Sequence, residues 1–159
     1  MRRLGYSVLS VCLLAGCGDT TLAGSVSALF PLDVSAEAVQ VNPEAFQVTY
    51  LHNQATAVDI VAQIGLALSG LAFQPGASID LSGEYSPGHP RCTVTHHADG
   101  EPERTLPLVS KGSFHLGSGG QVGQQTSGDF SIAFVSDGSY GSGRTIYGSF
   151  GGVALDAGF

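Results

Sequence analysis

The clearest structural signal in this chain lies in residues 128–135, which read GDFSIAFV. Three large apolar side chains, Phe130, Ile132 and Phe134, alternate there with small or polar ones. Alternation with a period of two is typical of a strand that buries one of its faces. The pattern therefore predicts that these three side chains point into the core of a sheet.

A loop and a second strand follow this segment. Residues 136–143 are rich in glycine and serine and predict a hairpin loop, and residues 144–155 predict the returning strand. In the returning strand Ile146 and Phe150 fall on one face. Three large apolar residues fall on the opposite face: Tyr147, Val153 and Leu155. We expect Phe150 to meet the side chains of the first strand in the core.

Earlier segments show the same alternation at intervals of about 8–12 residues, separated by turns that contain glycine or proline. They predict shorter strands over residues 39–41, 46–51, 78–82, 91–97, 106–109 and 113–116. Strands at this spacing are typical of antiparallel sandwiches and barrels. Together the segments predict an all-β fold: a compact antiparallel β-sandwich over residues 28–159, with a barrel as the alternative.

Residues 58–68 leave two interpretations open. Apolar residues occupy every even position, as in a strand, yet several of them also line one face of a helix. Gly65 would weaken a helix by about 1 kcal/mol relative to alanine, whereas in a strand it suggests a bulge. Because the neighbouring segments are strand-like, we favour a strand over a helix.

The amino-terminal residues carry a targeting signal. Positive charge on Arg2 and Arg3 precedes an apolar run over residues 4–14, which is shorter than the roughly 20 residues that a membrane-spanning helix needs. Two small residues and Cys17 follow. This order is that of a secretory signal peptide with its cleavage site.

The end of this signal, Leu14-Ala15-Gly16-Cys17, resembles the lipobox of bacterial lipoproteins. The resemblance implies a signal peptide over residues 1–16, cleavage before Cys17, and acyl chains on Cys17 that attach the protein to a membrane of the cell envelope. Residues 17–27 are then expected to form a lipidated, flexible tether. Gly18 stands where an aspartate would resemble an inner-membrane retention signal, which favours the outer membrane.

The charge of the chain limits its partners. The formal net charge is −7 at pH 7, and charged residues make up only 12% of the chain. Removal of residues 1–16 takes the charge to −9, because thirteen acidic residues then face four cations: Lys111, Arg91, Arg104 and Arg144. Four dispersed cations form no basic patch, so we exclude nucleic acid as a partner. We also expect lipid, and not charge, to hold the protein at the membrane.

Cysteine and histidine supply a candidate metal site. Cys12 would be removed with the signal peptide and Cys17 lipidated, which leaves Cys92 as either a buried apolar residue or a reactive thiol. The residues around Cys92 give a candidate set of metal ligands: His89, Cys92, His96 and His97. If residues 91–97 form a strand, Cys92 and His96 share a face. The alternative is a buried Cys92 beside exposed histidines.

No enzyme signature is complete in the sequence. The serine nucleophile elbow GxSxG, the zinc motif HExxH and the phosphate-binding loop are all missing. We therefore expect a noncatalytic envelope lipoprotein that binds a protein partner or contributes to surface structure, without a cofactor. The alternatives are a small-ligand or metal-binding module, and a hydrolase whose site the sequence does not reveal.

Overall fold

Twelve strands and one short 3₁₀ helix make up residues 20–158, the part of the chain that the structure, a computed structural model, describes. In chain order the elements are β1 (Thr21–Ala23), η1 (Ser25–Ala28), β2 (Ala36–Val41), β3 (Ala45–Asn53), β4 (Val58–Ala67), β5 (Ser78–Asp80), β6 (Glu84–Ser86), β7 (His89–Pro90), β8 (Cys92–His97), β9 (Arg104–Thr105), β10 (Val109–Ser118), β11 (Gln125–Phe134) and β12 (Thr145–Asp156). Within residues 20–158 no helix has the length and apolar character that crossing a membrane requires. The prediction of an all-β fold is confirmed.

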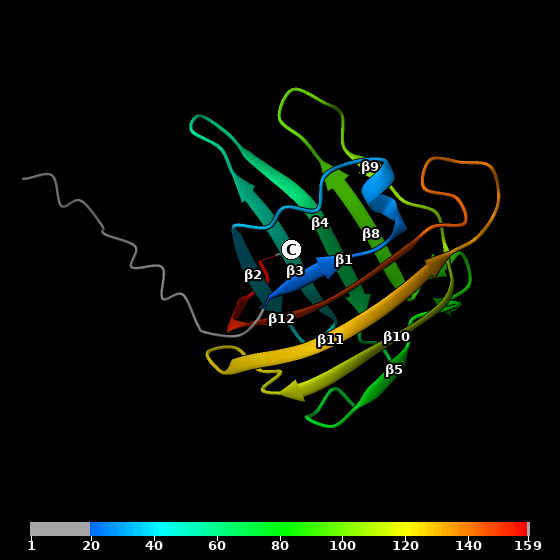
Figure 1. The fold of residues 1–159 in the computed structure, drawn as a ribbon. Helices are drawn as coiled ribbons and strands as arrows, with labels where there is room; N and C mark the ends of the chain where they lie inside the picture. The colour runs from blue at the N-terminus through cyan, green and yellow to red at the C-terminus, as the bar shows by residue number, and fades with distance from the viewer. Residues whose placement is uncertain (1–19, 159) are drawn as a thin grey trace, which may run out of the picture.

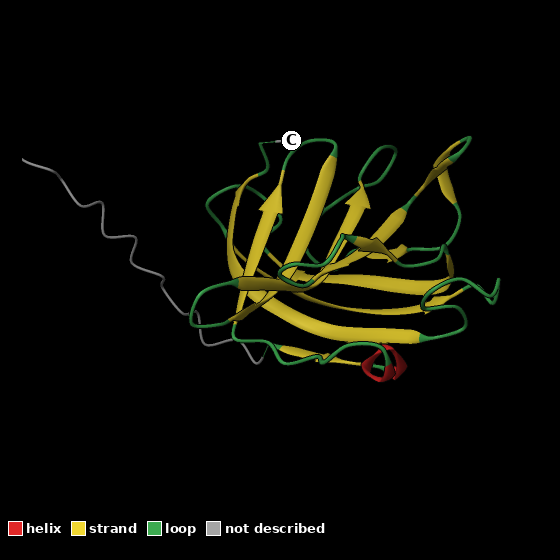
Figure 2. Ribbon diagram, turned by 90° about the horizontal axis from the view of Figure 1, so that it is seen from above, coloured by secondary structure: helices red, strands yellow, loops and turns green. Residues whose placement is uncertain are grey.

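Ten of the strands form one sheet in the order β5-β10-β11-β12-β2-β3-β4-β8-β9, with β1 paired to β12. The sheet curls on itself, so that β2, β3, β4 and β8 cross behind β10, β11 and β12 (Figure 1, Figure 2). The short strands β6 and β7 form a second, two-stranded sheet. The fold therefore lies between the predicted sandwich and its alternative, the barrel, because its two layers are halves of one curled sheet.

The strand β12 joins the two halves. Residues 145–153 pair antiparallel with β11, and residues 147–149 also pair antiparallel with β1. The last three residues pair in parallel with β2, where Ala154 lies opposite Val39. Every other pair of neighbouring strands in the described residues is antiparallel. The predicted antiparallel arrangement thus needs one correction. Most of the chain separates β2 from β12, so no local pattern could signal this pairing.

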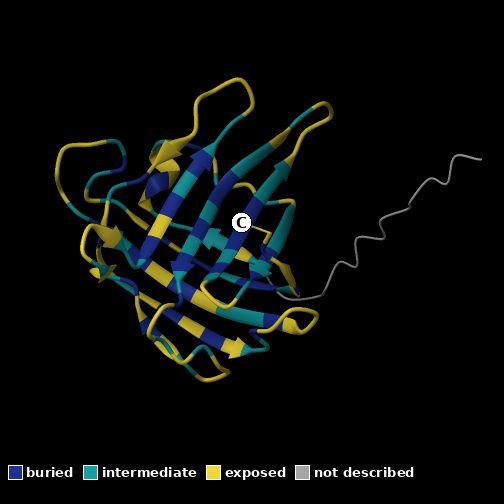
Figure 3. Ribbon diagram, turned by 180° about the vertical axis from the view of Figure 1, so that it is seen from behind, coloured by how far each residue is buried: buried dark blue, intermediate teal, exposed yellow. Residues whose placement is uncertain are grey.

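The core lies between the two halves of the sheet, where buried positions alternate with exposed ones along the strands (Figure 3). Phe130, Ile132, Phe134 and Phe150 are each no more than 3% exposed. The opposite face of β12 is exposed at three positions: Tyr147, Val153 and Leu155. The faces predicted for the two carboxyl-terminal strands are confirmed.

The ambiguous segment forms β4, so the choice of a strand over residues 58–68 is confirmed. Its bulge lies elsewhere than expected. The register between β3 and β4 shifts at Val61, between Ile60 and Ala62, and both Val61 and Ala62 are buried. Gly65 instead pairs in regular register, and a Cβ there would lie 3.0 Å from the Oγ1 of Thr93. The glycine therefore accommodates a side chain of the neighbouring strand.

The described domain begins earlier than residue 28. The strand β1 pairs with β12, and Val26 in η1 is fully buried, so part of the tether expected over residues 17–27 belongs to the fold. The close approach of β1 depends on Gly148, where a Cβ would lie 2.3 Å from the carbonyl oxygen of Thr21. Because β1 is held by backbone pairing opposite a glycine, its sequence shows no alternating apolar pattern, and this strand could not be predicted. The predictions for residues 1–16 and for Cys17 lie outside the described residues.

Candidate functional site

The structure separates the four candidate metal ligands. Cys92 and His96 lie on the inward face of β8 and are 2% and 8% exposed, whereas His97 lies on the opposite face. His89 begins β7 and lies beside Tyr85, with 5.8 Å between the ring centroids. No three histidine, cysteine, aspartate or glutamate side chains of residues 20–158 come together as a metal site. Cys92 and His96 share a face of the strand, as predicted. The strand does not bring the four predicted ligands close enough together to bind one metal ion.

The thiol of Cys92 is a poor ligand in this setting. Burial raises its pKa to about 12, so the thiol stays protonated at neutral pH. A metal would need the thiolate. Of the two interpretations of Cys92, the buried apolar residue is the one that the structure supports.

His96 has a defined place at the edge of the core. Its Nδ1 lies 3.0 Å from the carbonyl oxygen of Val61. Because a carbonyl only accepts hydrogen bonds, Nδ1 carries the proton and donates, which leaves Nε2 as an acceptor when the ring is neutral. The imidazole also stacks on Phe30, with ring centroids 3.9 Å apart and planes 8° from parallel. The bulge in β4 supplies the partner, because Val61 is the residue at which the register shifts.

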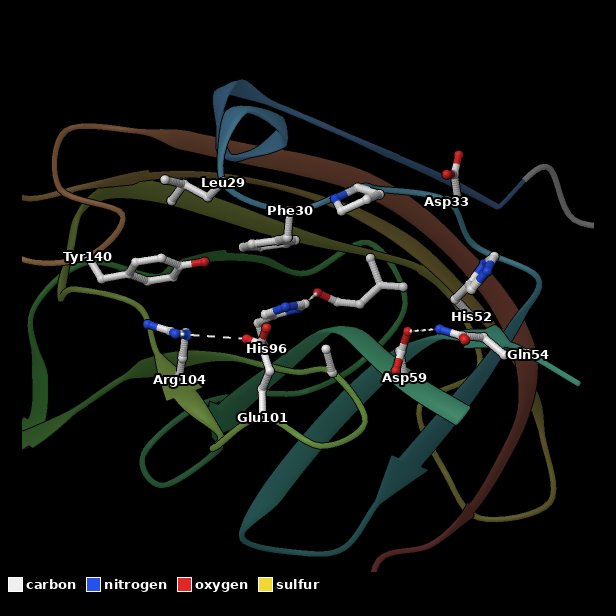
Figure 4. Close-up of a pocket in the computed structure, with 13 residues that line it drawn as sticks. Leu29, Phe30, Asp33, His52, Gln54, Asp59, His96, Glu101, Arg104 and Tyr140 are labelled. Atoms are coloured by element: carbon white, nitrogen blue, oxygen red, sulfur yellow. Dashed lines mark hydrogen bonds and ion pairs between the residues drawn. The ribbon is translucent and has the colours of Figure 1, made fainter. Parts of the chain in front are cut away.

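These residues border a pocket of about 470 Å³, which we call the rim pocket (Figure 4). It lies where β3, β4 and β8 meet the segment after η1 and the loop before β12. Its main side chains are Phe30, His52, Asp59, His96, Arg104 and Tyr140. Aromatic rings therefore share the pocket with groups of both charges.

Hydrogen bonds hold the carboxylate of Asp59 in the rim pocket. The backbone N–H of Asp99 donates to Oδ1 at 2.7 Å, and Nε2 of Gln54 donates to Oδ2 at 2.5 Å. The hydrogen bond from Asp99 is the largest cause that lowers the pKa of Asp59 below its usual value of 3.8. Asp59 is therefore ionised at neutral pH and is unsuited to act as a general acid.

A cation and a ring form another side of the rim pocket. The guanidinium carbon of Arg104 lies 4.8 Å from the centre of the Tyr140 ring, and its Nη2 lies 3.8 Å from the carboxylate of Glu101. The Nδ1 of His52 is buried and has no hydrogen-bond partner within residues 20–158. Such a mixture suits the binding of a polar or charged group against an aromatic surface.

The candidate set of metal ligands included only His96 among these residues. The others come from five separate segments of the chain, and single residues such as Phe30, Asp59 and Tyr140 form no motif. The N–H of Asp99 reaches the carboxylate of Asp59 across 40 positions of sequence. Only the packing of the strand ends brings these residues together.

A second, more open groove of about 800 Å³ runs over the outer surface of β3, β4 and β8. Tyr85 and His89 of the two-stranded sheet line one side of this groove. Arg91, the residue after β7, lines the groove as well. The guanidinium of Arg91 lies 5.8 Å from the centre of the Tyr85 ring and donates to the carbonyl oxygens of Ala67 and Ser69 at 2.9 and 2.8 Å. These bonds fasten the small sheet to the end of β4.

No protein-family model matches this chain, and no curated protein or solved structure matches it.

Proposed function

We propose that the protein is a noncatalytic binding protein of the bacterial cell envelope, held at the outer membrane by acyl chains on Cys17. The observation that carries the proposal is the sequence Leu14-Ala15-Gly16-Cys17 behind a charged start and a short apolar run. The folded domain begins at Thr21, four residues after Cys17, so the domain would stand close to the lipid headgroups.

The place of the rim pocket supports the binding role. The strand β1 runs antiparallel to β12, so the chain enters β1 from the side of the carboxyl end of β12, at Thr20. Tyr140 of the rim pocket precedes the amino end of β12. Over twelve residues a strand separates its ends by up to about 35 Å. A protein anchored through Cys17 would therefore present the rim pocket to a protein partner in the envelope, away from its own membrane.

A comparison of two cysteine variants tests the anchor. Cys17→Ser should abolish fatty-acid labelling of the protein in growing cells and release the domain from the membrane fraction after a high-salt wash. Cys12→Ser is the matched control, because it removes a cysteine of the apolar run and leaves residues 14–17 unchanged. If the Cys17→Ser protein stayed in the membrane pellet and kept its label, the proposed anchoring would be wrong.

Crosslinking in intact cells tests the binding role. A photoreactive phenylalanine analogue at Tyr140 should give a discrete adduct with another envelope protein. The same analogue at Tyr147, which is 51% exposed on the outer face of β12, should not. The adduct from Tyr140 should also be lost in an Arg104→Ala background, which removes the cation beside that ring. The same adducts from both positions, or none from Tyr140, would contradict a binding role for the rim pocket.

A further inference from the structure

Three apolar side chains are exposed together at the carboxyl end of β12. Val153 and Leu155 lie on its outer face and are 45% and 56% exposed. Val122, which is 55% exposed, belongs to the turn between β10 and β11. This turn lies along β12, because the N–H of Gly123 donates to the carbonyl oxygen of Ala154 at 2.7 Å. We call Val122, Val153 and Leu155 the apolar patch.

The chain enters the domain beside this patch. In β1, Thr21 pairs with Ser149, and the preceding residue continues along β12 toward its carboxyl end. The side chain of Thr20 lies beside the carboxylate of Glu37, and the same carboxylate accepts the N–H of Gly151 at 2.9 Å. Thr20 is therefore close to Gly151. This residue lies between the part of β12 that pairs with β1 and the part that pairs with β2.

Covalent geometry keeps the anchor close to the patch. Three residues lead from Cys17 to Thr20, and an extended chain spans at most about 11 Å over that length. Along β12, two residues lead from Gly151 to Val153, which is about 7 Å. Acyl chains on Cys17 must therefore enter a bilayer within a short distance of Val153.

The surroundings of the patch are uncharged over long stretches. Residues 116–128 contain no Asp, Glu, Lys, Arg or His, and neither do residues 145–155. The first carboxylate after them is that of Asp156. A chain of net charge −9, the value after removal of residues 1–16, gains no attraction from anionic headgroups, so a surface that rests on a bilayer must do so with neutral and apolar side chains.

We propose that the apolar patch rests on the lipid bilayer next to the lipidated Cys17, with its three side chains inserted at the interface. The inference rests on the proposed function, because the acyl chains bring the patch to the bilayer. The acyl chains fix the position of the domain, and the patch fixes its orientation. In that orientation the rim pocket, beyond the other end of β12, points away from the membrane.

Tryptophan fluorescence tests this contact, because the chain contains no tryptophan of its own. The lipidated full-length protein is reconstituted into phosphatidylcholine vesicles, with or without bromine on the acyl chains, as Leu155→Trp and as Val122→Trp. Both should emit at shorter wavelength than the same proteins in detergent-free buffer with urea, and both should lose intensity in brominated vesicles. The two variants lie on different elements, so a folding defect in one, judged by circular dichroism, leaves the other as the test.

Leu108→Trp is the matched control. Leu108 is 59% exposed, and the N–H of Val135 donates to its carbonyl oxygen at 2.9 Å. That bond places it at the carboxyl end of β11, whereas the amino end of β11 pairs with Val153. The indole at position 108 should emit as a solvent-exposed group and should not respond to bromine.

The outcomes separate the inference from the proposed function. If the proteins do not float with the vesicles, the lipid anchor is wrong and the contact falls with it. If they float but Leu155→Trp and Val122→Trp behave like Leu108→Trp, the anchor stands and the contact is refuted. A shift to shorter wavelength without bromine quenching would mean that a second protein surface covers the patch, which also refutes the contact.

Discussion

The two ends of the curled sheet fill their interiors with different chemistry. At one end four phenylalanine rings touch one another, with centroids 4.9–6.1 Å apart: Phe46, Phe73, Phe114 and Phe150. At the other end a single stacked pair, Phe30 and His96, separates the core from the rim pocket. The space between the two layers is closed by apolar rings alone in the first case and by a phenylalanine ring stacked on an imidazole in the second.

Local backbone features differ around the two sets of rings. Around Phe150 the pairing of β11 with β12 keeps its register, and Gly128 leaves room for the ring, since a Cβ there would lie 2.7 Å from Cζ of Phe150. Near the stacked pair, the bulge at Val61 turns a carbonyl toward His96. A break in the hydrogen-bond ladder supplies a polar group that a regular strand would have paired. One end of this fold is therefore closed by apolar packing, whereas the other end makes polar contacts.

The strongest test of this comparison is to remove one ring from each end. Phe114 is fully buried against three other rings, so Phe114→Ala should lower the free energy of unfolding by about 3–5 kcal/mol. Phe30 is 6% exposed and borders the open pocket, so water can fill the space that Phe30→Ala leaves, and we expect a loss of about 2 kcal/mol. Urea unfolding of the two variants measures the difference.

Leu108→Ala is the control for these melts, because the side chain is exposed and should cost no more than about 0.5 kcal/mol. Equal losses for Phe114→Ala and Phe30→Ala would show that the two ends are packed alike. The proposed contrast between them would then be wrong.

The same contrast decides what could be predicted from the sequence. Strand periodicity is a local property of the sequence. The alternating pattern in residues 128–135 and in the returning strand therefore predicted both strands and the faces that they bury. The bulge at Val61 depends on how β3 and β4 align, and β1 depends on a backbone partner more than 120 residues away. Neither feature changes the apolar pattern of its own segment. For the same reason the candidate set of metal ligands included His96 but none of the other side chains that line the rim pocket.

A smaller effect separates two carboxylates: Glu37, which is half-buried on β2, and Asp59, which lies in the rim pocket. Burial raises the pKa of Glu37 above its usual 4.5, against the opposing hydrogen bond from Gly151, whereas the hydrogen bond from Asp99 lowers the pKa of Asp59 below 3.8. A raised pKa means that Glu37 stabilises the fold fully below about pH 4.5 and that this contribution is lost as pH rises through its folded pKa. A lowered pKa means that Asp59 stabilises the fold above about pH 3.8 and that this contribution is lost as pH falls through its folded pKa.

The two carboxylates should therefore respond to neutralisation with opposite signs. At neutral pH, Glu37→Gln should raise the urea midpoint, because it removes a charge that the interior disfavours, and this gain should shrink as the pH falls toward 4.5. Asp59→Asn should lower the midpoint at neutral pH, and its cost should fade below about pH 3.8, where the wild-type carboxyl also takes up a proton.

Glu103→Gln, at an exposed position, is the control for a change of net charge alone. Melts at several pH values between about 3 and 8 measure all three variants. If Glu37→Gln and Asp59→Asn shifted the midpoint in the same direction at neutral pH, the fold would treat the half-buried carboxylate and the hydrogen-bonded one alike, and the proposed contrast between the two carboxylates would be wrong.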